Sequence, residues 1–323
     1  MGGRWRWGAQ AGPTGALWCA LAMVVLGASV PVSGALTGYP TALAQAARYA
    51  LGAVVMLGLL ALRPPPAVKV SGREWMLLAT MAAVGLAGFN LALMTALRHA
   101  DAAVVAAVVG CVPLALAVAS ALLAGRMPTR SALAAAAVVV AGTVVMHGPG
   151  AAGGAGMAAA VCALFCDVVF TLLAARLTPR LGPLRVAAYS CALAVPILAA
   201  FAVLTGEAQV WRLPSRSEAT VIVFLGIVLT AGAFLAWFHG VSRLGADKAG
   251  LFVALVPTTA VAVAAVADAT LPPPNVVLGV LTVGAGILAA FVRPTAVPVP
   301  LLASARPGTT ALPRPAFPPA LAG

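Results

Sequence analysis

Long stretches of this chain carry no charged side chain, and each stretch has the length of a membrane-spanning helix. The run from 102 to 124, for example, contains only apolar and small residues. A helix needs roughly 20 such residues to cross a bilayer. Over the whole chain, 63% of residues are hydrophobic, only 8% are charged, and the mean hydropathy is +1.07. Soluble domains have about 25% charged residues, so we predict an all-α integral membrane protein.

Short breaks divide the chain into apolar segments, and we expect each segment to form one transmembrane helix. The ten segments are 14–34, 39–62, 73–97, 102–124, 129–147, 157–177, 183–205, 218–239, 246–268 and 275–292. The first could also be a cleaved signal peptide, but its apolar run is long and another span follows at once. The remaining parts are a short N-terminus (1–13), a Gly- and Ala-rich connection (148–156) and a Pro-rich tail (293–323) that we expect to be disordered.

The two halves of the chain share a pattern of landmarks at a fixed offset of 144 residues. The pairs are Ala102 and Ala246, Pro113 and Pro257, Pro128 and Pro272, and Gly142 and Gly286. A fixed offset without gaps indicates an internal duplication. With five spans in each half, the second copy enters the membrane upside down. We therefore predict two inverted five-helix repeats, residues 14–147 and 157–292, as in many secondary transporters.

The formal net charge of +12 belongs to the connections between spans, and no basic face suited to nucleic acid is present. If the N-terminus is cytoplasmic, three of the 19 Lys and Arg residues (Arg98, Arg212 and Arg216) lie outside. Arg48 lies within a span, and the other 15 lie inside. Basic residues concentrate on the cytoplasmic side of membrane proteins. This distribution predicts a multi-pass plasma-membrane protein with both termini in the cytoplasm.

Only two ionisable residues lie clearly within apolar spans, Arg48 and Asp167. A charge at the centre of a transmembrane helix costs at least about 2.5–3.5 kcal/mol, so such residues usually have a function. Asp167 could bind a proton or a cation, and Arg48 could bind an anion or latch a gate. The alternative is structural: Asp167 is neutral, or it is paired with Arg48 itself.

Polar, aromatic and proline residues give further candidates for the transport pathway. Asn90 could line a central cavity; Phe234, at the offset of 144, and Trp237 could line it or pack between helices. Pro113 and Pro257 lie near the middle of repeat-related spans, where a proline removes a helix hydrogen bond. Because repeat-related helix breaks often mark transporter sites, we predict a hinge at both prolines.

The cysteines give no support for a metal site. Cys162 and Cys166 lie one helical turn apart beside Asp167, but no His or second Cys pair is near them in the sequence. We therefore expect no metal and no cofactor.

The chain resembles the EamA-type transporters of the drug/metabolite transporter superfamily over residues 14–292. The resemblance rests on Arg48-Tyr49, on Ala96-Leu97 leading through Ala102 to Pro113 and Gly142, and on Gly245-Ala246-Asp247 leading to Pro257 and Gly286. It implies ten helices in two inverted repeats, alternating access, and export of small metabolites or drugs. Arg48 and Tyr49 match the family's Arg-aromatic pair, whereas Asp167 is not part of the family pattern.

The function predicted from the sequence is a proton-coupled or facilitative exporter of a small, partly apolar metabolite, and not an enzyme. Its partners would be a small-molecule substrate, the lipid bilayer and, if coupled, protons; a homodimer is one option. A membrane enzyme acting on lipid-linked substrates is the first alternative, with Arg98, His99 and Asp101 as its nearest polar cluster. A scaffold or sensor without transport activity is the second.

Overall fold

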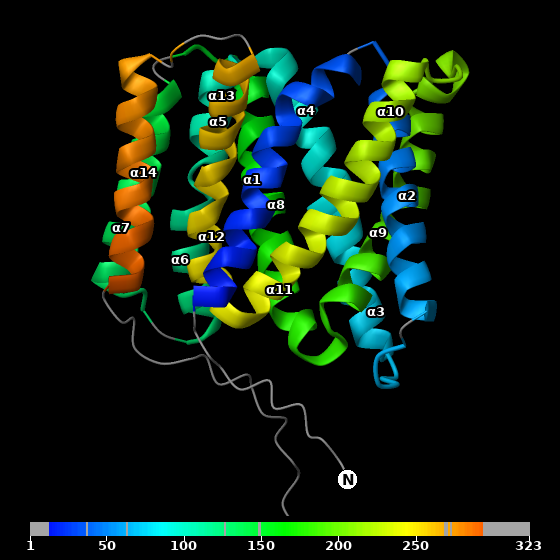
Figure 1. Cartoon of the computed structure of the whole chain (residues 1–323), viewed down its shortest axis with the longest axis horizontal. Helices are drawn as coiled ribbons and strands as arrows, with labels where there is room; N and C mark the ends of the chain where they lie inside the picture. The colour runs from blue at the N-terminus through cyan, green and yellow to red at the C-terminus, as the bar shows by residue number, and fades with distance from the viewer. Residues whose placement is uncertain are drawn as a thin grey trace, which may run out of the picture.

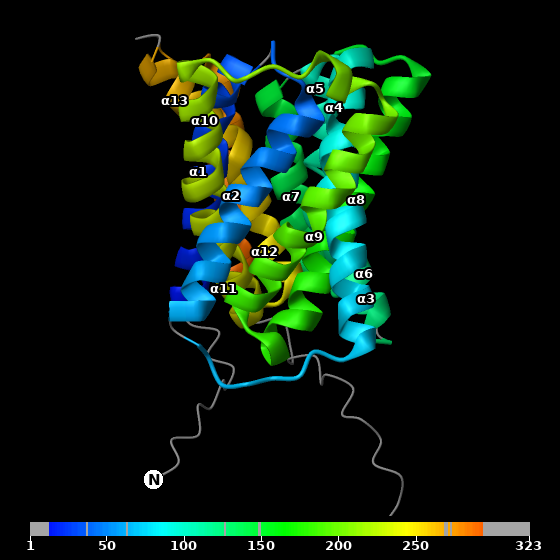
Figure 2. The same ribbon diagram turned by 90° about the vertical axis from the view of Figure 1, so that its right-hand side faces the viewer.

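The structure is a computed structural model that describes residues 13–36, 38–62, 64–125, 127–147, 150–267, 271 and 273–292. Within these residues the regular structure is helical and contains no strand. The long helices stand roughly parallel in one bundle (Figure 1, Figure 2). The predictions for the N-terminus, the Pro-rich tail and Pro272 fall outside the described residues.

The first half of the chain forms helices that alternate between the two ends of the bundle. They are α1 (Pro13–Ser33), η1 (Gly34–Leu36), α2 (Thr41–Leu62), α3 (Gly72–Thr80), η2 (Met81–Gly88), α4 (Phe89–His99), α5 (Ala102–Val109), α6 (Val112–Leu123) and α7 (Arg130–His147). The α2–α3 connection lies at the end that we call the lower end, as drawn in Figure 1.

The second half continues the same alternation. Its elements are α8 (Gly154–Leu181), α9 (Pro183–Leu204), η3 (Glu207–Val210), α10 (Arg216–Phe224), η4 (Leu225–Ala233), α11 (Phe234–Leu244), α12 (Ala246–Leu251), η5 (Phe252–Ala254), α13 (Leu255–Ala267) and α14 (Pro274–Val292). The α9–α10 connection lies at the upper end of the bundle (Figure 2).

Eight helices among the described residues are long and apolar enough to cross a membrane. Each of the spans Gly72–His99 and Arg216–Leu244 combines two α-helices with a π-helical segment between them. The apolar parts of α7 and α14, Arg130–Met146 and Pro274–Ala289, are shorter. The architecture is therefore all-helical and multi-pass.

Small residues bring α7 and α14 into close contact at one edge of the bundle (Figure 1). A Cβ atom on Gly142 would lie 2.8 Å from the backbone nitrogen of Val283, and one on Gly286 would lie 2.7 Å from Cγ2 of Val139. Asn275 Nδ2 also donates a hydrogen bond to the carbonyl of Met146, at 3.2 Å. Close backbone approach at glycines is a common way for helices to associate in lipid.

The third span of each half begins with the same reciprocal cap. The backbone N–H of Glu74 donates to Ser71 Oγ at 3.3 Å, and Glu74 Oε2 accepts from the backbone N–H of Ser71 at 2.8 Å. Ser215 and Glu218 form the same capping box with the same two distances. Each capping box provides acceptors for two backbone N–H groups at the start of its helix. The boxes lie 144 residues apart, as do the first residues of the π-helical segments η2 and η4.

The fourth and ninth predicted spans are both interrupted just before their central proline. Gly110 and Cys111 separate α5 from α6, and Pro113 lies in the first turn of α6. The 3₁₀ segment η5 separates α12 from α13, and Pro257 follows in the first turn of α13. By contrast, α9 runs through Pro196 without a break.

Candidate functional site

Arg48 is a half-buried cation on α2. Its guanidinium carbon lies 4.5 Å from the ring centroid of Tyr49. Its Nε atom is enclosed and has no hydrogen-bond partner among the described residues. The ion pairs found among the described residues join Glu74 with Arg180 and Arg212 with Glu218. Arg48 therefore has no carboxylate partner among the described residues. Burial of an unpaired charge is costly.

Tyr49 contacts the helices that follow both π-helical segments. Asn90, at the start of α4, donates from Nδ2 to the Tyr49 hydroxyl at 3.0 Å and to the Leu86 carbonyl at 2.8 Å. The ring of Phe234, the first residue of α11, lies 6.3 Å from that of Tyr49. Asn90 and Phe234 are the pair that the offset of 144 relates. One side chain of α2 thus contacts equivalent positions of both halves.

Four rings form what we call the aromatic cluster: Tyr49, Phe170, Phe234 and Phe238. The Phe170 ring lies 5.8 Å from that of Phe234 and 5.5 Å from that of Phe238, and the last two lie 5.9 Å apart. These separations are typical of favourable aromatic pairs. Gly85 of η2 makes room for Phe170, because a Cβ at Gly85 would lie 2.8 Å from Phe170 Cβ. Within the cluster, Phe234 is half-buried and the other rings are buried.

Asp167 lies on the face of α8 that points into the bundle. Residues three and four positions apart share a helix face, and at these positions Ala163, Phe170 and Thr171 are all buried. Asp167 itself is half-buried, and it takes no part in the hydrogen bonds or ion pairs found among the described residues. The pairing of Asp167 with Arg48, which the sequence left open, is therefore not formed.

The remaining predicted residues occupy packing positions. Trp237 is 3% exposed, and its Nε1 finds no hydrogen-bond partner in the described part of the chain. Cys166 is buried and Cys162 is exposed. No group of three or more His, Cys, Asp or Glu side chains suited to a metal comes together in the described part of the chain. The two cysteines therefore gain no third ligand there.

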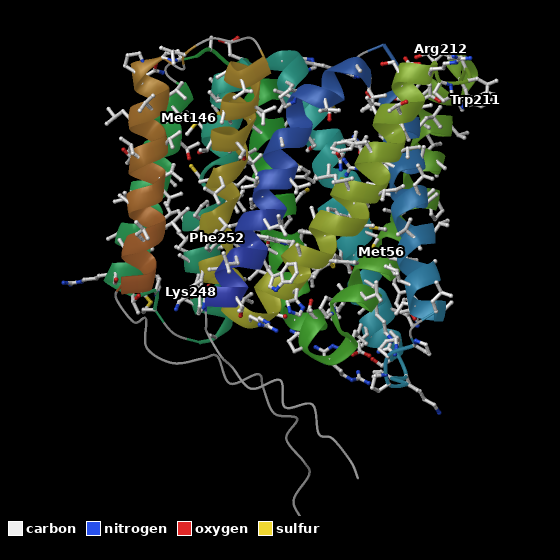
Figure 3. The ribbon with its side chains drawn as sticks, in the orientation of Figure 1. Met56, Met146, Trp211, Arg212, Lys248 and Phe252 are labelled. Carbon is white, nitrogen blue, oxygen red and sulfur yellow. The ribbon has the colours of Figure 1, made fainter. Side chains whose placement is uncertain are left out.

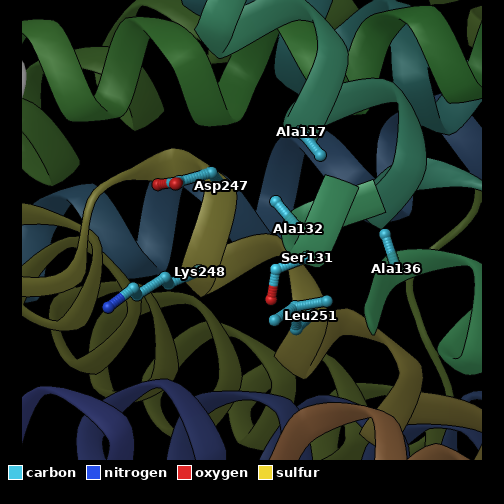
Figure 4. Close-up of a pocket in the computed structure, with 7 residues that line it drawn as sticks. All are labelled: Ala117, Ser131, Ala132, Ala136, Asp247, Lys248 and Leu251. Atoms are coloured by element: carbon cyan, nitrogen blue, oxygen red, sulfur yellow. The ribbon is translucent and has the colours of Figure 1, made fainter. Parts of the chain in front are cut away.

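A small hollow lies between α6, α7 and α12 (Figure 4), and none of the predicted site residues lines it. Ala117, Ser131, Ala132, Ala136, Asp247, Lys248 and Leu251 line it. Its volume of about 20 Å³ is enough for one water molecule. It is therefore too small for a metabolite.

At the lower end of the bundle, Arg180 of α8 forms an ion pair with Glu74 of the first capping box. Arg180 also donates to the carbonyl of Lys69 at 3.0 Å, and Arg185 donates to that of Pro66 at 2.7 Å. The α2–α3 connection is thus held against the start of α9.

Arg212 lies at the upper end of the bundle (Figure 3). It donates two hydrogen bonds, of 2.7 and 2.5 Å, to Glu218 of the second capping box. Its guanidinium carbon lies 5.3 Å from the ring centroid of Tyr39, just before α2. Glu207 Oε2 accepts a hydrogen bond of 2.8 Å from the backbone N–H of Ala42. Sequence reasoning missed both end contacts, although a Ser followed three residues later by Glu before an apolar run is a readable cap signal.

The sequence model of the EamA-like transporter family matches residues 13–147 and 154–292, which is most of the chain. The chain belongs to the EamA-like transporter family. This agrees with the resemblance carried by Arg48-Tyr49 and the repeated proline and glycine landmarks. The protein is thus a membrane transporter of the multi-pass kind, and transporters of this sort usually are not enzymes.

Individual relatives of this EamA-like chain are distant. It is 21% identical over 250 residues to the uncharacterized transporter YetK of Bacillus subtilis (strain 168), covering 75% of this chain and 76% of that protein. A solved structure, described only as the crystal structure of a protein, matches with a TM-score of 0.75 and 22% identity. The match covers 87% of this chain and 97% of the other, which shows a shared fold.

Membership of the EamA-like family implies a small-molecule substrate and a lipid environment. It does not assign roles to individual side chains. The roles of Arg48, Tyr49, Asn90, Asp167, Phe234 and Trp237 therefore depend on the chemistry of their surroundings.

Proposed function

We propose that this protein is a secondary-active exporter of a small, partly apolar metabolite in the plasma membrane. One observation carries the proposal: Arg48 and Asp167 are half-buried, neither has an ion-pair partner among the described residues, and the aromatic cluster joins their helices. Unpaired charges inside a membrane protein usually serve a substrate or ion pathway. In this proposal Arg48 binds an anionic group and Asp167 carries a proton.

The proposed architecture has ten spans in two inverted five-helix repeats, with both termini in the cytoplasm. The repeat is supported by the capping boxes and π-helical segments, which recur at the offset of 144, and by the helix interruptions before Pro113 and Pro257. In this proposal α7 and α14 are the fifth and tenth spans. Each is a shorter apolar helix whose apolar face is covered by the other. In this arrangement the lower end of the bundle is cytoplasmic.

Alternating access would use the interrupted helices as hinges. The helix breaks before Pro113 and Pro257 leave backbone groups that need partners inside the bundle. Repeat-related breaks of this kind are where transporters bend around a central site. The two prolines therefore mark our proposed hinges, and the ion-paired capping boxes mark segments that stay fixed.

The enzyme alternative is not favoured by the geometry of its candidate cluster. His99 Nδ1 lies 2.9 Å from the Thr95 carbonyl, and Asp101 Oδ2 accepts a hydrogen bond of 2.8 Å from the Ala151 backbone. Both side chains thus bond to nearby backbone. Neither is arranged as a nucleophile with its base.

The transport function is tested by substrate-stimulated proton flux in liposomes that contain the purified protein. The screen covers organic acids, amino acids and cationic drugs, and compares the wild type with Asp167→Asn. We expect one compound class to drive proton movement, with Asp167→Asn lowering the flux at least tenfold. Asp247→Asn, a carboxyl at the start of α12, is the matched control and should keep the wild-type rate.

The outcomes separate the parts of this proposal. Compound movement without protons would leave a facilitated carrier and give Asp167 a structural role. Full-rate flux in both Asp167→Asn and Arg48→Ala would contradict the proposed site. No movement of protons or of any compound in the panel would favour the scaffold or sensor alternative.

A further inference from the structure

The groups that surround Arg48 restrict the charge of the ligand that it can bind. No carboxylate lies within ion-pair distance of the guanidinium among the described residues, and the neighbouring side chain of Tyr49 is an uncharged phenol. The site therefore carries a net charge of one unit. A ligand with a single negative charge neutralises it, whereas a phosphate monoester, at about −1.5 to −2, leaves excess charge in an apolar interior.

Two donors at this site fit a carboxylate. The planar guanidinium of an arginine offers parallel N–H groups that match both carboxylate oxygens. Tyr49 adds a second donor: its hydroxyl oxygen already accepts from Asn90, so its own hydrogen is available for donation. A carboxylate beside Arg48 would then satisfy both side chains.

The aromatic cluster lies directly beside these donors. Tyr49 belongs to both, and Phe234, 6.3 Å from it, is the half-buried ring of the cluster. Phe170 and Phe238 also pack against Phe234. A ligand ring placed on Phe234 would gain the offset or edge contacts that aromatic pairs prefer.

The acidic group nearest the cluster in sequence is Asp167 of α8. Asp167 precedes Phe170 by one helical turn on α8, and it makes no ion pair with Arg48. An ammonium group next to the ligand carboxylate would therefore find no carboxylate partner beside Arg48. This disfavours α-amino acids relative to the same acids without the amino group.

We propose that the site formed by Arg48, Tyr49 and Phe234 binds an aromatic monocarboxylic acid, with its carboxylate on Arg48 and its ring on the aromatic cluster. This inference rests on the proposed transport function and names its substrate class.

Binding of 3-phenylpropionate to the full-length protein in nanodiscs tests the proposal by isothermal titration and ligand-induced thermal shift. The comparison probes are propionate, which lacks the ring; 3-phenylpropylamine, which lacks the carboxylate; and phenylalanine, which adds the ammonium. We expect 3-phenylpropionate to bind at least tenfold more tightly than each of the three. These comparisons need only the wild-type protein.

Variants then assign the contacts. Arg48→Gln should weaken 3-phenylpropionate binding at least tenfold, and Arg98→Gln, an exposed arginine at the end of α4, should leave it unchanged. If Arg48→Gln does not fold, Arg48→Lys keeps the charge without the planar fork and should also bind more weakly. Phe234→Leu should reduce the preference for 3-phenylpropionate over propionate.

Several results would overturn the inference. They are equal or tighter binding of the amine or of phenylalanine, unchanged binding in Arg48→Gln, and no binding of any probe. Transport of another compound without 3-phenylpropionate binding would refute this substrate class and keep the exporter. Binding of 3-phenylpropionate with no flux of any compound would keep the site and refute the transport function.

Discussion

Two side chains inside this bundle, Arg48 and Asp167, bear most directly on the chemistry of the protein. Arg48 and Asp167 are both half-buried, and neither has an opposite charge as partner among the described residues. Leaving a charge unpaired in a low-dielectric interior typically costs several kcal/mol. The rest of the fold must offset this cost, which is why we propose a functional role for both residues.

The hydrogen bond from Asn90 to Tyr49 joins α4 to α2, and its strength can be measured with a double-mutant cycle. Tyr49→Phe and Asn90→Ala should show a coupling energy of about 0.6 kcal/mol, the typical value for side-chain hydrogen bonds between membrane helices. The measurement is the free energy of unfolding from SDS titration of each variant.

A matched control for this cycle is available on the same helix. Thr95 is exposed, and its hydroxyl donates to the Leu91 carbonyl of its own helix at 2.8 Å, so Thr95→Ala should show no coupling to Tyr49→Phe. A cycle in which Asn90→Ala costs the same in both Tyr49 backgrounds would contradict the bond.

Whole helices are positioned by glycine contacts and by caps. α7 and α14 are the shorter apolar helices of the described chain, and each packs on the other at glycine positions. The capping boxes of α3 and α10 hold an Arg of another segment, Arg180 at the lower end and Arg212 at the upper end. These ion pairs thus stabilise both ends of the bundle by joining different segments of the chain.

Gly142→Ala should destabilise the α7–α14 contact by about 1–3 kcal/mol, the usual cost of overpacking. The new Cβ would lie 2.8 Å from the backbone nitrogen of Val283 and 2.9 Å from the Gly279 carbonyl oxygen, and backbone atoms cannot move aside easily. The same unfolding titration measures the loss.

Gly284 of α14 provides the control, because a Cβ there meets nothing within 4 Å. Gly284→Ala should leave the free energy of unfolding unchanged or raise it, since alanine favours helix over glycine. Equal losses in the two variants would show that the helix pair does not depend on close approach.

At the scale of the whole molecule, the proposed orientation depends on the distribution of basic residues. Most Lys and Arg residues fall on one side of the predicted ten-span map, and membrane proteins keep such residues in the cytoplasm. We therefore propose that the lower end of the bundle lies inside the cell and the upper end outside.

Labelling with a membrane-impermeant maleimide checks this orientation in a variant without the five native cysteines. Trp211 lies in the upper connection and Met127 lies in the connection between α6 and α7. Both side chains are exposed, and each is replaced by cysteine in turn. We expect Trp211→Cys to react in intact cells and Met127→Cys to react only after permeabilisation. Labelling of both from the same side would refute the ten-span map.

The sequence by itself determined the class of this protein, because composition decides whether a chain can use water or lipid as its solvent. It also predicted hinges at Pro113 and Pro257, which stay predictions, and it singled out Arg48 and Asp167, because a charge in an apolar span is costly. Only the tertiary structure decided which side chains meet. It keeps Arg48 and Asp167 apart, joins Tyr49 to both Asn90 and Phe234, and pairs Glu74 with Arg180. Such contacts join segments far apart in the chain, and helix periodicity alone cannot specify them because it fixes only which residues share a face.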